Sequence, residues 1–471
     1  MKSGESVEKT HMDYAYELDL AIKPDSTVPL LDREYGTFSG AGIPLFSLGG
    51  GVFRWALFEI LTRLHALRGY YIAETPIIAS SELFKVSGHL DFYRKNMFLF
   101  DIEGHDYAIK PMNCPYHILI FMSQVARFRS KVPLPFKIFE VGRVHRYEPS
   151  GSLYGLLRVR GFTQDDAHII TPSEKAIDVI TDVFDEMIMV LGNVFLLDLS
   201  RADIHLRLSL SDKSLIGTEF MGSRDEWDQA EGALEEAARK LARKYGVSYS
   251  MEEGEAAFYG PKIDVVVKLE EAGIVKEWQL GTIQFDFNLP SRFRLYELVK
   301  SVYGDMDVFI VHRALLGSVE RFLGIYLEYS RGRMPFPLAP LQVGIIGIQT
   351  GGELDGEIAR ASEKLASALT GMGFRVGVRM ANKTSLSGEV RQIESTIKPP
   401  VLAFIGEREV REGRVTLRVY DHSTRRRRTT VMGFEEAING GFEDLARKLE
   451  EGVRRLIGYA PRIPLRLDQL A

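Results

Sequence analysis

The stretch FEVGRVHRYEPSGSLYGLLRVRGFTQDDAHII, residues 139–170, decides the fold predicted for this chain of 471 residues. Successive side chains of a strand point to opposite faces, so Val144, Arg146 and Glu148 share one face of its first half. A loop rich in glycine and serine follows. The returning strand, GFTQDDAHII, presents on one face Phe162, Gln164, Asp166 and His168. If the two halves pair as an antiparallel hairpin, they share one strongly polar face.

This polar face has two interpretations. It is either a solvent-exposed sheet face with incidental ion pairs, which is common in antiparallel sheets, or the floor of a substrate site. On such a floor an arginine grips phosphate, a ring stacks on a base and carboxylates hold an amine. A further strand, EWQLGTIQFDF, repeats the pattern with Gln284 and Asp286 on one face, beside Gly281, which would let a ligand approach closely. The repetition favours the substrate floor.

Alternating stretches elsewhere predict the rest of an antiparallel sheet. The segment FIVHRALLGSVERF is apolar up to His312 and then turns helical, with Arg321 on the helix. Residues 54–70 carry an apolar stripe at helical spacing, and residues 223–246 form a second helix that begins with a Ser-x-x-Glu capping box. Several long alternating strands in a row, with helices packed on one side, predict an antiparallel sheet of the α+β class.

The proline-rich segment RMPFPLAPLQ, residues 333–342, predicts a connector, because proline fixes φ and donates no backbone hydrogen bond. Beyond it, apolar runs alternate with helical ones. The predicted strands span residues 341–348, 375–380, 401–406 and 415–420. The predicted helices lie near residues 355–369, 389–397 and 444–458. This alternation predicts a smaller α/β domain with a mostly parallel sheet.

Composition narrows the class of protein. The single cysteine excludes an internal disulfide and fits a reducing, cytoplasmic location. The N-terminus has no apolar stretch typical of a signal peptide, and acidic residues interrupt the most apolar stretch, residues 179–197, so we expect no membrane segment. The net charge of −5 does not indicate nucleic-acid binding. The run Arg425–Arg428 is the clearest basic cluster, and alone it is best interpreted as a solvated turn.

The single cysteine, Cys114, lies in KPMNCPYHILIF with His117 three positions later. A buried cysteine is most often a small core residue. It could also be a nucleophile, or one corner of a metal site whose other ligands lie far along the chain. A local zinc module built on Cys114 and His117 is a further alternative.

Several motifs together resemble those of the class II aminoacyl-tRNA synthetases, and within them the threonyl-tRNA synthetases. AETPIIAS resembles motif 1, VHRYEPSGSLYGLLRVRGFTQDDAHI motif 2, and HRALLGSVERFLGIY motif 3. PMNCP, AFYGPKID and QLGTIQFDF are the stretches that point to threonine. The resemblance runs from about residue 53 to residue 331 in this order, which makes it specific.

The resemblance implies an α+β catalytic domain, with an antiparallel sheet of six or more strands flanked by helices, and a smaller α/β anticodon-binding domain. We expect an N-terminal extension at residues 1–40, the catalytic domain at 41–335 and the anticodon-binding domain at 336–471. The implied activity is that of a threonine–tRNA ligase, which forms threonyl-adenylate from L-threonine and ATP and transfers it to the 3′ end of tRNA(Thr). The alternatives are a non-catalytic paralogue that binds tRNA and a synthetase for another amino acid.

Three residues match the family's zinc ligands, namely Cys114, His168 and His312. Zinc (Zn²⁺) accepts thiolate and imidazole readily, and three protein ligands leave a position open for substrate. Threonine would coordinate through its amino group and its hydroxyl. Valine cannot supply the oxygen, so the implied metal site distinguishes the two amino acids.

Further roles carry over from the motifs position by position. The residues that match threonine-binding positions are Asp166, which holds the amine, Tyr259, Gln284, Gln279 and Lys262. Those that match positions for ATP, which binds with Mg²⁺, are Arg146 for the α-phosphate, Glu148 for the adenine amine, Arg158 for the γ-phosphate, Phe162 for stacking, Gln164 and Arg321. The implied catalytic residues are Arg146, Arg321 and His89, of which His89 matches a histidine proposed to deprotonate the tRNA hydroxyl. The anticodon-binding positions are Glu409, Arg418 and Asn382, the last in MANKTSLSGEVRQ, which departs from the family pattern.

Residues 1–40 are too few for the domain with which most family members hydrolyse serine wrongly attached to tRNA. Serine keeps the hydroxyl that a zinc site recognises, and one methyl group gives only about 10–200-fold discrimination. We therefore expect no cis-editing of Ser-tRNA(Thr) and a separate trans-editing protein as a partner. The motif 1 segment implies a homodimer.

Overall fold

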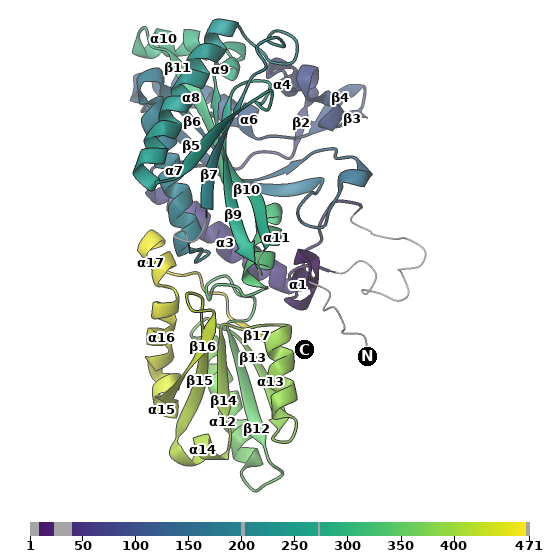
Figure 1. Ribbon diagram of the computed structural model, residues 1–471, viewed down its shortest axis with the longest axis vertical. Coiled ribbons are helices and arrows are strands. Elements are labelled where there is room, and N and C mark those ends of the chain that lie inside the picture. The colour runs from purple at the N-terminus through teal and green to yellow at the C-terminus, as the bar shows by residue number, and fades with distance from the viewer. Residues whose placement is uncertain (1–8, 23–39, 199–202, 272–273, 468–471) are drawn as a thin grey trace.

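The structure is a computed structural model that describes residues 9–22, 40–198, 203–271 and 274–467. Residues 1–8 and 23–39 of the expected N-terminal extension lie outside the described residues. Figure 1 shows two bodies along the long axis, each built around its own sheet. The upper body holds an eight-stranded and a three-stranded sheet, and the lower body a six-stranded sheet.

The eight-stranded sheet has the order β1-β5-β6-β11-β10-β9-β7-β8. Its strands are β1 Tyr71–Ile72, β5 Phe136–His145, β6 Gly161–Pro172, β7 Asp203–Leu210, β8 Ser248–Glu253, β9 Lys262–Glu271, β10 Ile274–Asp286 and β11 Val308–Ser318. The six central strands are antiparallel, and β1 and β8 add parallel edges. The antiparallel sheet expected from the sequence is confirmed.

The predicted hairpin forms over residues 136–172, but β5 ends at His145, so Arg146 and Glu148 follow the strand and do not lie on it. Strands β5 and β6 pair antiparallel, with Val144 opposite Phe162 and Ile138 opposite His168. Strand β11 then pairs with β6, which places His312 directly opposite His168. Since this strand continues to Ser318, the prediction that the chain turns helical directly after His312 is wrong by six residues.

Helices cover the two faces of this sheet unequally. The apolar side chains of α3 Leu48–Leu67, α7 Ala176–Asn193 and α8 Arg224–Tyr245 share one large core with one face. The opposite face is covered at one end by α6 Cys114–Phe128 and α10 Leu295–Tyr303. The polar side chains of β6, β10 and β11 line a cavity on this second face.

The remaining elements of the upper body are short. They are the helices α1 His11–Glu17, α4 Ser81–Val86, α5 His89–Phe92, α9 Asn288–Arg292 and α11 Val319–Ser330, and the strands β2 Ile78–Ser80, β3 Phe98–Ile102 and β4 His105–Ile109 of the three-stranded sheet.

Gly281 lies at an irregularity between β10 and β9. A Cβ there would meet the carbonyl oxygens of Leu315 and Ala314 at 2.5 and 2.7 Å. The glycine therefore serves strand packing, and the expectation that it admits a ligand is wrong.

The six-stranded sheet has the order β16-β15-β14-β12-β13-β17. Its strands are β12 Val343–Gln349, β13 Arg375–Asn382, β14 Val401–Ile405, β15 Arg414–Asp421, β16 Arg426–Gly433 and β17 Leu465–Leu467. The accompanying helices are α12 Asp355–Gly371, α13 Leu386–Ser395, α14 Glu407–Glu412, α15 Phe434–Glu436, α16 Phe442–Leu449 and α17 Glu451–Ile457. Three strand pairs are parallel and two are antiparallel, so the mostly parallel α/β prediction is confirmed.

One local prediction for this domain is wrong, and a second is only partly right. The helix predicted over residues 444–458 is two helices that meet at Glu450, a fully buried carboxylate paired with Arg454 and Arg462. The arginine run is not a simple solvated turn, because β16 begins inside it. Arg427 donates from Nη1 to the Pro400 carbonyl at 3.0 Å, which ties this strand to the loop before β14.

Within the described ranges, no helix combines the length and the apolar character that a membrane crossing needs.

Candidate active site and metal centre

A cavity of about 340 Å³ opens on the second face of the eight-stranded sheet. The predicted site residues that line it are Cys114, Arg146, Gln164, Asp166, His168, Tyr259, Gln284 and His312. A larger cavity of about 1260 Å³ lies between the two domains and is lined by none of these residues. The smaller cavity gathers the predicted site residues, so it is the better candidate for chemistry.

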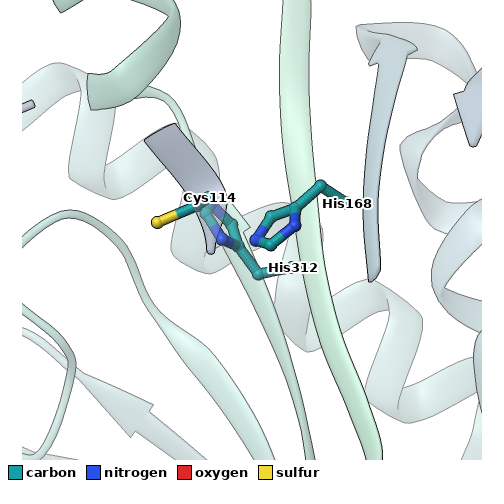
Figure 2. Close-up of side chains that lie close together, drawn as sticks. All are labelled: Cys114, His168 and His312. Atoms are coloured by element: carbon teal, nitrogen blue, oxygen red, sulfur yellow. The ribbon is translucent and has the colours of Figure 1, made fainter. Parts of the chain in front are cut away.

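Cys114, His168 and His312 form a compact cluster at this cavity (Figure 2). One ligand atom from each side chain lies within 4.8 Å of the other two. Cys114 is the first residue of α6, whereas the histidines come from adjacent strands and their ring centroids are 4.5 Å apart. All three side chains are buried. One thiol and two imidazoles match the donors that zinc prefers, so the cluster could hold a metal ion.

Each histidine of the cluster has one ring nitrogen occupied by another side chain. Nε2 of His312 lies 2.7 Å from Oδ2 of Asp286, and Nδ1 of His168 lies 2.7 Å from Nδ1 of His117. The other oxygen of Asp286 accepts the backbone N–H groups of Asn288 and Leu289 at 2.8 and 3.0 Å. The ring nitrogens left over are Nδ1 of His312 and Nε2 of His168. This is the arrangement expected around metal-ligating histidines.

Burial shifts the pKa values of Cys114 and His168 in this cluster. Burial, followed by the negative charges of Asp166 and Asp286, raises the pKa of the Cys114 thiol well above its ordinary value. Burial, followed by the neighbouring His312 and His117, lowers the pKa of His168 well below its ordinary value. The imidazole of His168 is therefore neutral and ready to act as a ligand. The thiol must lose its proton before it can bind a metal ion.

Asp166, the predicted amine-binding residue, points into the cavity beside the cluster. Its Oδ1 lies 4.0 Å from Nε2 of His168, and its Oδ2 accepts a 2.8 Å hydrogen bond from Nδ2 of Asn113. Tyr259 and Gln284 line the same cavity; the Tyr259 ring centroid lies 5.3 Å from that of His312. A carboxylate next to a metal cluster is suited to an α-amino group.

Arg146 also lines the cavity. Its guanidinium carbon is 5.1 Å from the ring centroid of Phe162 and 5.8 Å from that of Tyr93, and its Nε donates to the Pro111 carbonyl at 3.2 Å. The predicted nucleotide residues Glu148 and Arg158 do not line the cavity and bond to one another, with Nε of Arg158 3.0 Å from Oε2 of Glu148.

The other predicted site residues do not line this cavity. Nε2 of Gln279 donates to Asp264 at 2.6 Å, and Lys262 is ion-paired to the same carboxylate. Arg321 lies on α11, where burial lowers the pKa of its guanidinium. His89 is fully buried, with Nε2 3.9 Å from the Cys114 sulfur, and burial lowers its pKa to about 3.

The three predicted anticodon residues lie on separate elements of the second domain. Arg418 is exposed on β15, with its guanidinium carbon 4.8 Å from the ring centroid of Phe404. Asn382 is exposed at the end of β13 and accepts from the Thr384 backbone N–H at 3.1 Å. Glu409 accepts from the Gly406 N–H at 3.1 Å, so it also serves as a helix cap. Their roles stay predictions.

Sequence reasoning missed several residues of the site. Asn113, which fixes Asp166, and the cavity-lining Met112 are neighbours of Cys114 in PMNCP. Thr282 also lines the cavity, and its position two residues before Gln284 on the same strand face could have identified it. Tyr93 gave no comparable signal, because it approaches from a separate loop.

Comparisons with known proteins agree with this geometry. The tRNA synthetase class II core domain (G, H, P, S and T) matches residues 98–330, and the anticodon binding domain matches residues 342–440. A threonine–tRNA ligase catalytic subunit of Aeropyrum pernix is 60% identical over 466 residues, 98% of each chain. A threonine–tRNA ligase of Aquifex aeolicus is 40% identical over 380 residues, 80% of this chain and 55% of that one, so the chain spans about half of that relative.

Solved structures that resemble this chain are also those of aminoacyl-tRNA synthetases. A crystal structure assigned to a threonyl-tRNA synthetase of Aeropyrum pernix has a TM-score of 0.93 at 60% identity, covering 98% of this chain and 99% of that one. A prolyl-tRNA synthetase of Cryptosporidium parvum, at 14% identity and a TM-score of 0.61, shares the fold. With its class II core, its anticodon-binding domain and its match over nearly the whole length of the Aeropyrum subunit, the chain belongs to the threonyl-tRNA synthetase family.

Proposed function

We propose that this chain is a threonine–tRNA ligase that joins L-threonine to the 3′ end of tRNA(Thr) at the expense of ATP. One observation carries the choice of amino acid, namely the cluster of Cys114, His168 and His312 directly beside Asp166. The 60% identity with the Aeropyrum ligase subunit supports it. A non-catalytic paralogue has no chemical need for this cluster together with Arg146 at the same cavity.

We propose zinc as the metal of the cluster, because one thiolate and two imidazoles form a donor set that zinc favours. A bound zinc ion would take the amino and hydroxyl groups of threonine as further ligands, and valine lacks the hydroxyl. Asp166 would accept a hydrogen bond from the zinc-bound amino group, and Tyr259 and Gln284 would close the pocket around the side chain. We include Gln279 and Lys262 in this pocket as more distant members that position Asp264.

In the first step, the threonine carboxylate attacks the α-phosphorus of ATP and pyrophosphate leaves. The charge that builds on the phosphorus oxygens would be stabilised by Arg146, with Arg321 on the other side of the nucleotide. The nucleotide would bind as its Mg²⁺ complex to Glu148, Arg158, Phe162 and Gln164. In the second step, a ribose hydroxyl of the tRNA attacks the carbonyl carbon and AMP leaves. His89 is buried behind Cys114, so a role in deprotonating that hydroxyl would require movement.

We further propose that residues 41–335 act as the catalytic domain and residues 336–471 as the anticodon-binding domain, with Glu409, Arg418 and Asn382 near the anticodon.

We also propose a homodimer, which is supported by exposed apolar side chains on α3 and the segment after it. They are Trp55, Leu67, Tyr71, Ile72, Ile77 and Ile78. The sedimentation coefficient of the purified chain tests this. Because tRNA charging occurs where translation takes place, we propose a cytoplasmic location.

Threonine-dependent ATP–pyrophosphate exchange tests the proposed activity. We expect exchange with threonine and weak exchange with serine, whereas valine should give none above background. Absence of threonine-dependent exchange in zinc-replete protein that still binds tRNA(Thr) would instead support the non-catalytic paralogue. The expected absence of cis-editing is tested separately with pre-formed Ser-tRNA(Thr), which we expect this chain to leave intact.

A further inference from the structure

We propose that His117, supported by Glu140 and Lys110, is a positioning residue that holds the His168 ring with Nε2 free for the metal ion. This inference rests on the proposed metal site. It concerns how the chain prepares one ligand before the metal ion binds. His117 lies on α6, one turn after Cys114, so the same helix supplies one ligand and the support of another.

The contact between His117 and His168 is short and fully enclosed. Their Nδ1 atoms are 2.7 Å apart, and the two rings lie 79° to one another with centroids 4.8 Å apart. His117 is 0% exposed and His168 is 2% exposed, so water does not compete for this hydrogen bond. Two imidazole nitrogens at this distance share one proton, and one of them must therefore donate to the other.

Glu140 determines which histidine donates. Nε2 of His117 lies 3.6 Å from Oε2 of Glu140, longer than a hydrogen bond but close enough for a strong electrostatic preference. Neither atom has another hydrogen-bond partner among the described residues. A carboxylate accepts only, so the proton of His117 belongs on Nε2. Nδ1 of His117 then accepts, and Nδ1–H of His168 donates.

Glu140 is itself held in place by buried groups. Its Oε1 accepts from Nζ of Lys110 at 2.9 Å and from Oγ1 of Thr75 at 3.0 Å. Nζ of Lys110 also donates to the carbonyl of Thr75 at 3.2 Å. Lys110 and Glu140 are 1% and 2% exposed, so their opposite charges offset one another inside the protein. The chain of contacts runs from Lys110 through Glu140 and His117 to His168.

This arrangement excludes His117 as a metal ligand. One of its nitrogens faces His168 and the other faces Glu140, which leaves neither free to join Cys114. The other proposed ligand histidine, His312, is held in a similar way, because its Nε2 contacts the carboxylate of Asp286. The two histidines thus present different nitrogens, Nε2 from His168 and Nδ1 from His312, and each choice is fixed by its own partner.

Two substitutions at one position separate positioning from simple packing. His117→Leu fills the space but removes the acceptor for His168. His117→Asn places a carbonyl oxygen near the position of Nδ1 and so retains an acceptor. His65→Leu is the matched control, because His65 is also a fully buried helical histidine whose Nδ1 bonds a carbonyl, that of Leu61. His65 lies in the core on the opposite face of the sheet.

The readout is zinc affinity, measured by competition with a chromophoric chelator in the full chain without substrates. We expect His117→Leu to bind zinc about 10–100-fold more weakly than the unsubstituted chain, which is the usual cost of losing a group that supports a ligand. His117→Asn should recover most of that loss, and His65→Leu should bind zinc normally even if it melts at a lower temperature. Unchanged zinc affinity in a folded His117→Leu protein would overturn the proposal, as would a His117→Asn protein no better than His117→Leu.

A second measurement needs no substitution at position 117. The chain has 10 histidines, so ¹⁵N-histidine labelling gives a tractable NMR spectrum of the ring nitrogens. We expect His168, assigned by loss of its signals in His168→Asn, to carry its proton on Nδ1. A proton on Nε2 instead would overturn the proposal even if His117→Leu fails to fold. An unsubstituted chain that binds no zinc, yet shows His168 protonated at Nδ1, would contradict the metal site and retain the pairing with His117.

Discussion

Asn113 donates a 2.8 Å hydrogen bond from Nδ2 to Oδ2 of Asp166, and both side chains are buried beside the cluster of Cys114, His168 and His312. Asn113 immediately precedes Cys114, so the start of α6 positions both a predicted metal ligand and the carboxylate predicted to hold the substrate amine. Removal of this hydrogen bond leaves Asp166 free to rotate and its charge less well paired.

Asn113→Ala should therefore weaken threonine binding more than ATP binding. A hydrogen bond to a charged group contributes about 1.5–3 kcal/mol, which corresponds to roughly 10–150-fold in the KM for threonine. Pyrophosphate exchange measured against each substrate checks this, with Asn193→Ala as the control, because Asn193 bonds a helix carbonyl on α7 away from the cavity. Equal increases in both KM values would show that Asn113 acts on the whole site.

Glu148 and Arg158 provide a second prediction. They bond to each other at 3.0 Å, and the Arg158 side chain is 58% exposed, so the pair adds little to folding stability. If they grip opposite ends of ATP, Glu148→Gln should raise the KM for ATP several-fold and leave the melting temperature nearly unchanged. The exposed Arg408–Glu412 pair, also 3.0 Å long, is the matched control: Glu412→Gln should not affect the KM for ATP. A lower melting temperature with an unchanged KM would contradict the predicted role.

The polar face of the sheet was predictable because strand alternation is strict. Alternation alone placed Asp166 and His168 on one face, and pairing in register brought His312 opposite His168. The choice of Cys114 as their partner came from resemblance, since nothing in local sequence connects a helix start with two distant strands. The contact of His117 with His168 depends on how α6 packs across the sheet. The spacing of Cys114 and His117 along one helix does not reveal this contact.

The helix predicted near the C-terminus is two helices in the structure, which shows a second limit of prediction from the sequence. Residues 444–458 have a continuous amphipathic pattern, which predicts one helix. In the structure the helix stops at Glu450, whose buried carboxylate accepts from Nη2 of Arg462 at 2.9 Å. A tertiary ion pair with a residue beyond the helix decides the boundary, and helical periodicity carries no information about it.

Gly142 offers a steric test of the site. It faces Gln164 across the β5–β6 hairpin, and a Cβ there would lie 2.3 Å from Nδ2 of Asn113 and 2.6 Å from Oε1 of Glu140. Gly142→Ala must therefore push Asn113 away from Asp166, and we expect it to reproduce the threonine-specific KM increase of Asn113→Ala. Gly371→Ala, where a Cβ meets nothing within 4 Å, should leave exchange kinetics unchanged. Native threonine affinity in Gly142→Ala would show that the site relaxes around the methyl group.

The final prediction concerns stability in acid. Burial lowers the pKa of His422 to about 4, with Arg333 and Arg425 acting in the same direction and Asp421 and the Met334 backbone opposing them. The unfolded chain has an ordinary histidine pKa near 6.5, so between about pH 4 and 6.5 it binds more protons than the folded chain. Stability contributed by the neutral ring is therefore complete above pH 6.5 and falls as the pH drops toward 4.

His422→Gln removes this proton uptake. Urea unfolding at pH 7 and pH 4.5 should show that the unsubstituted chain loses about 1–3 kcal/mol more than the variant over this interval. The difference between the two chains isolates His422, since every other titrating group is common to both. His105→Gln, at an exposed position on β4, should follow the unsubstituted chain. Parallel pH dependence of the unsubstituted and His422→Gln chains would show that the His422 ring takes up its proton equally in the folded and unfolded states.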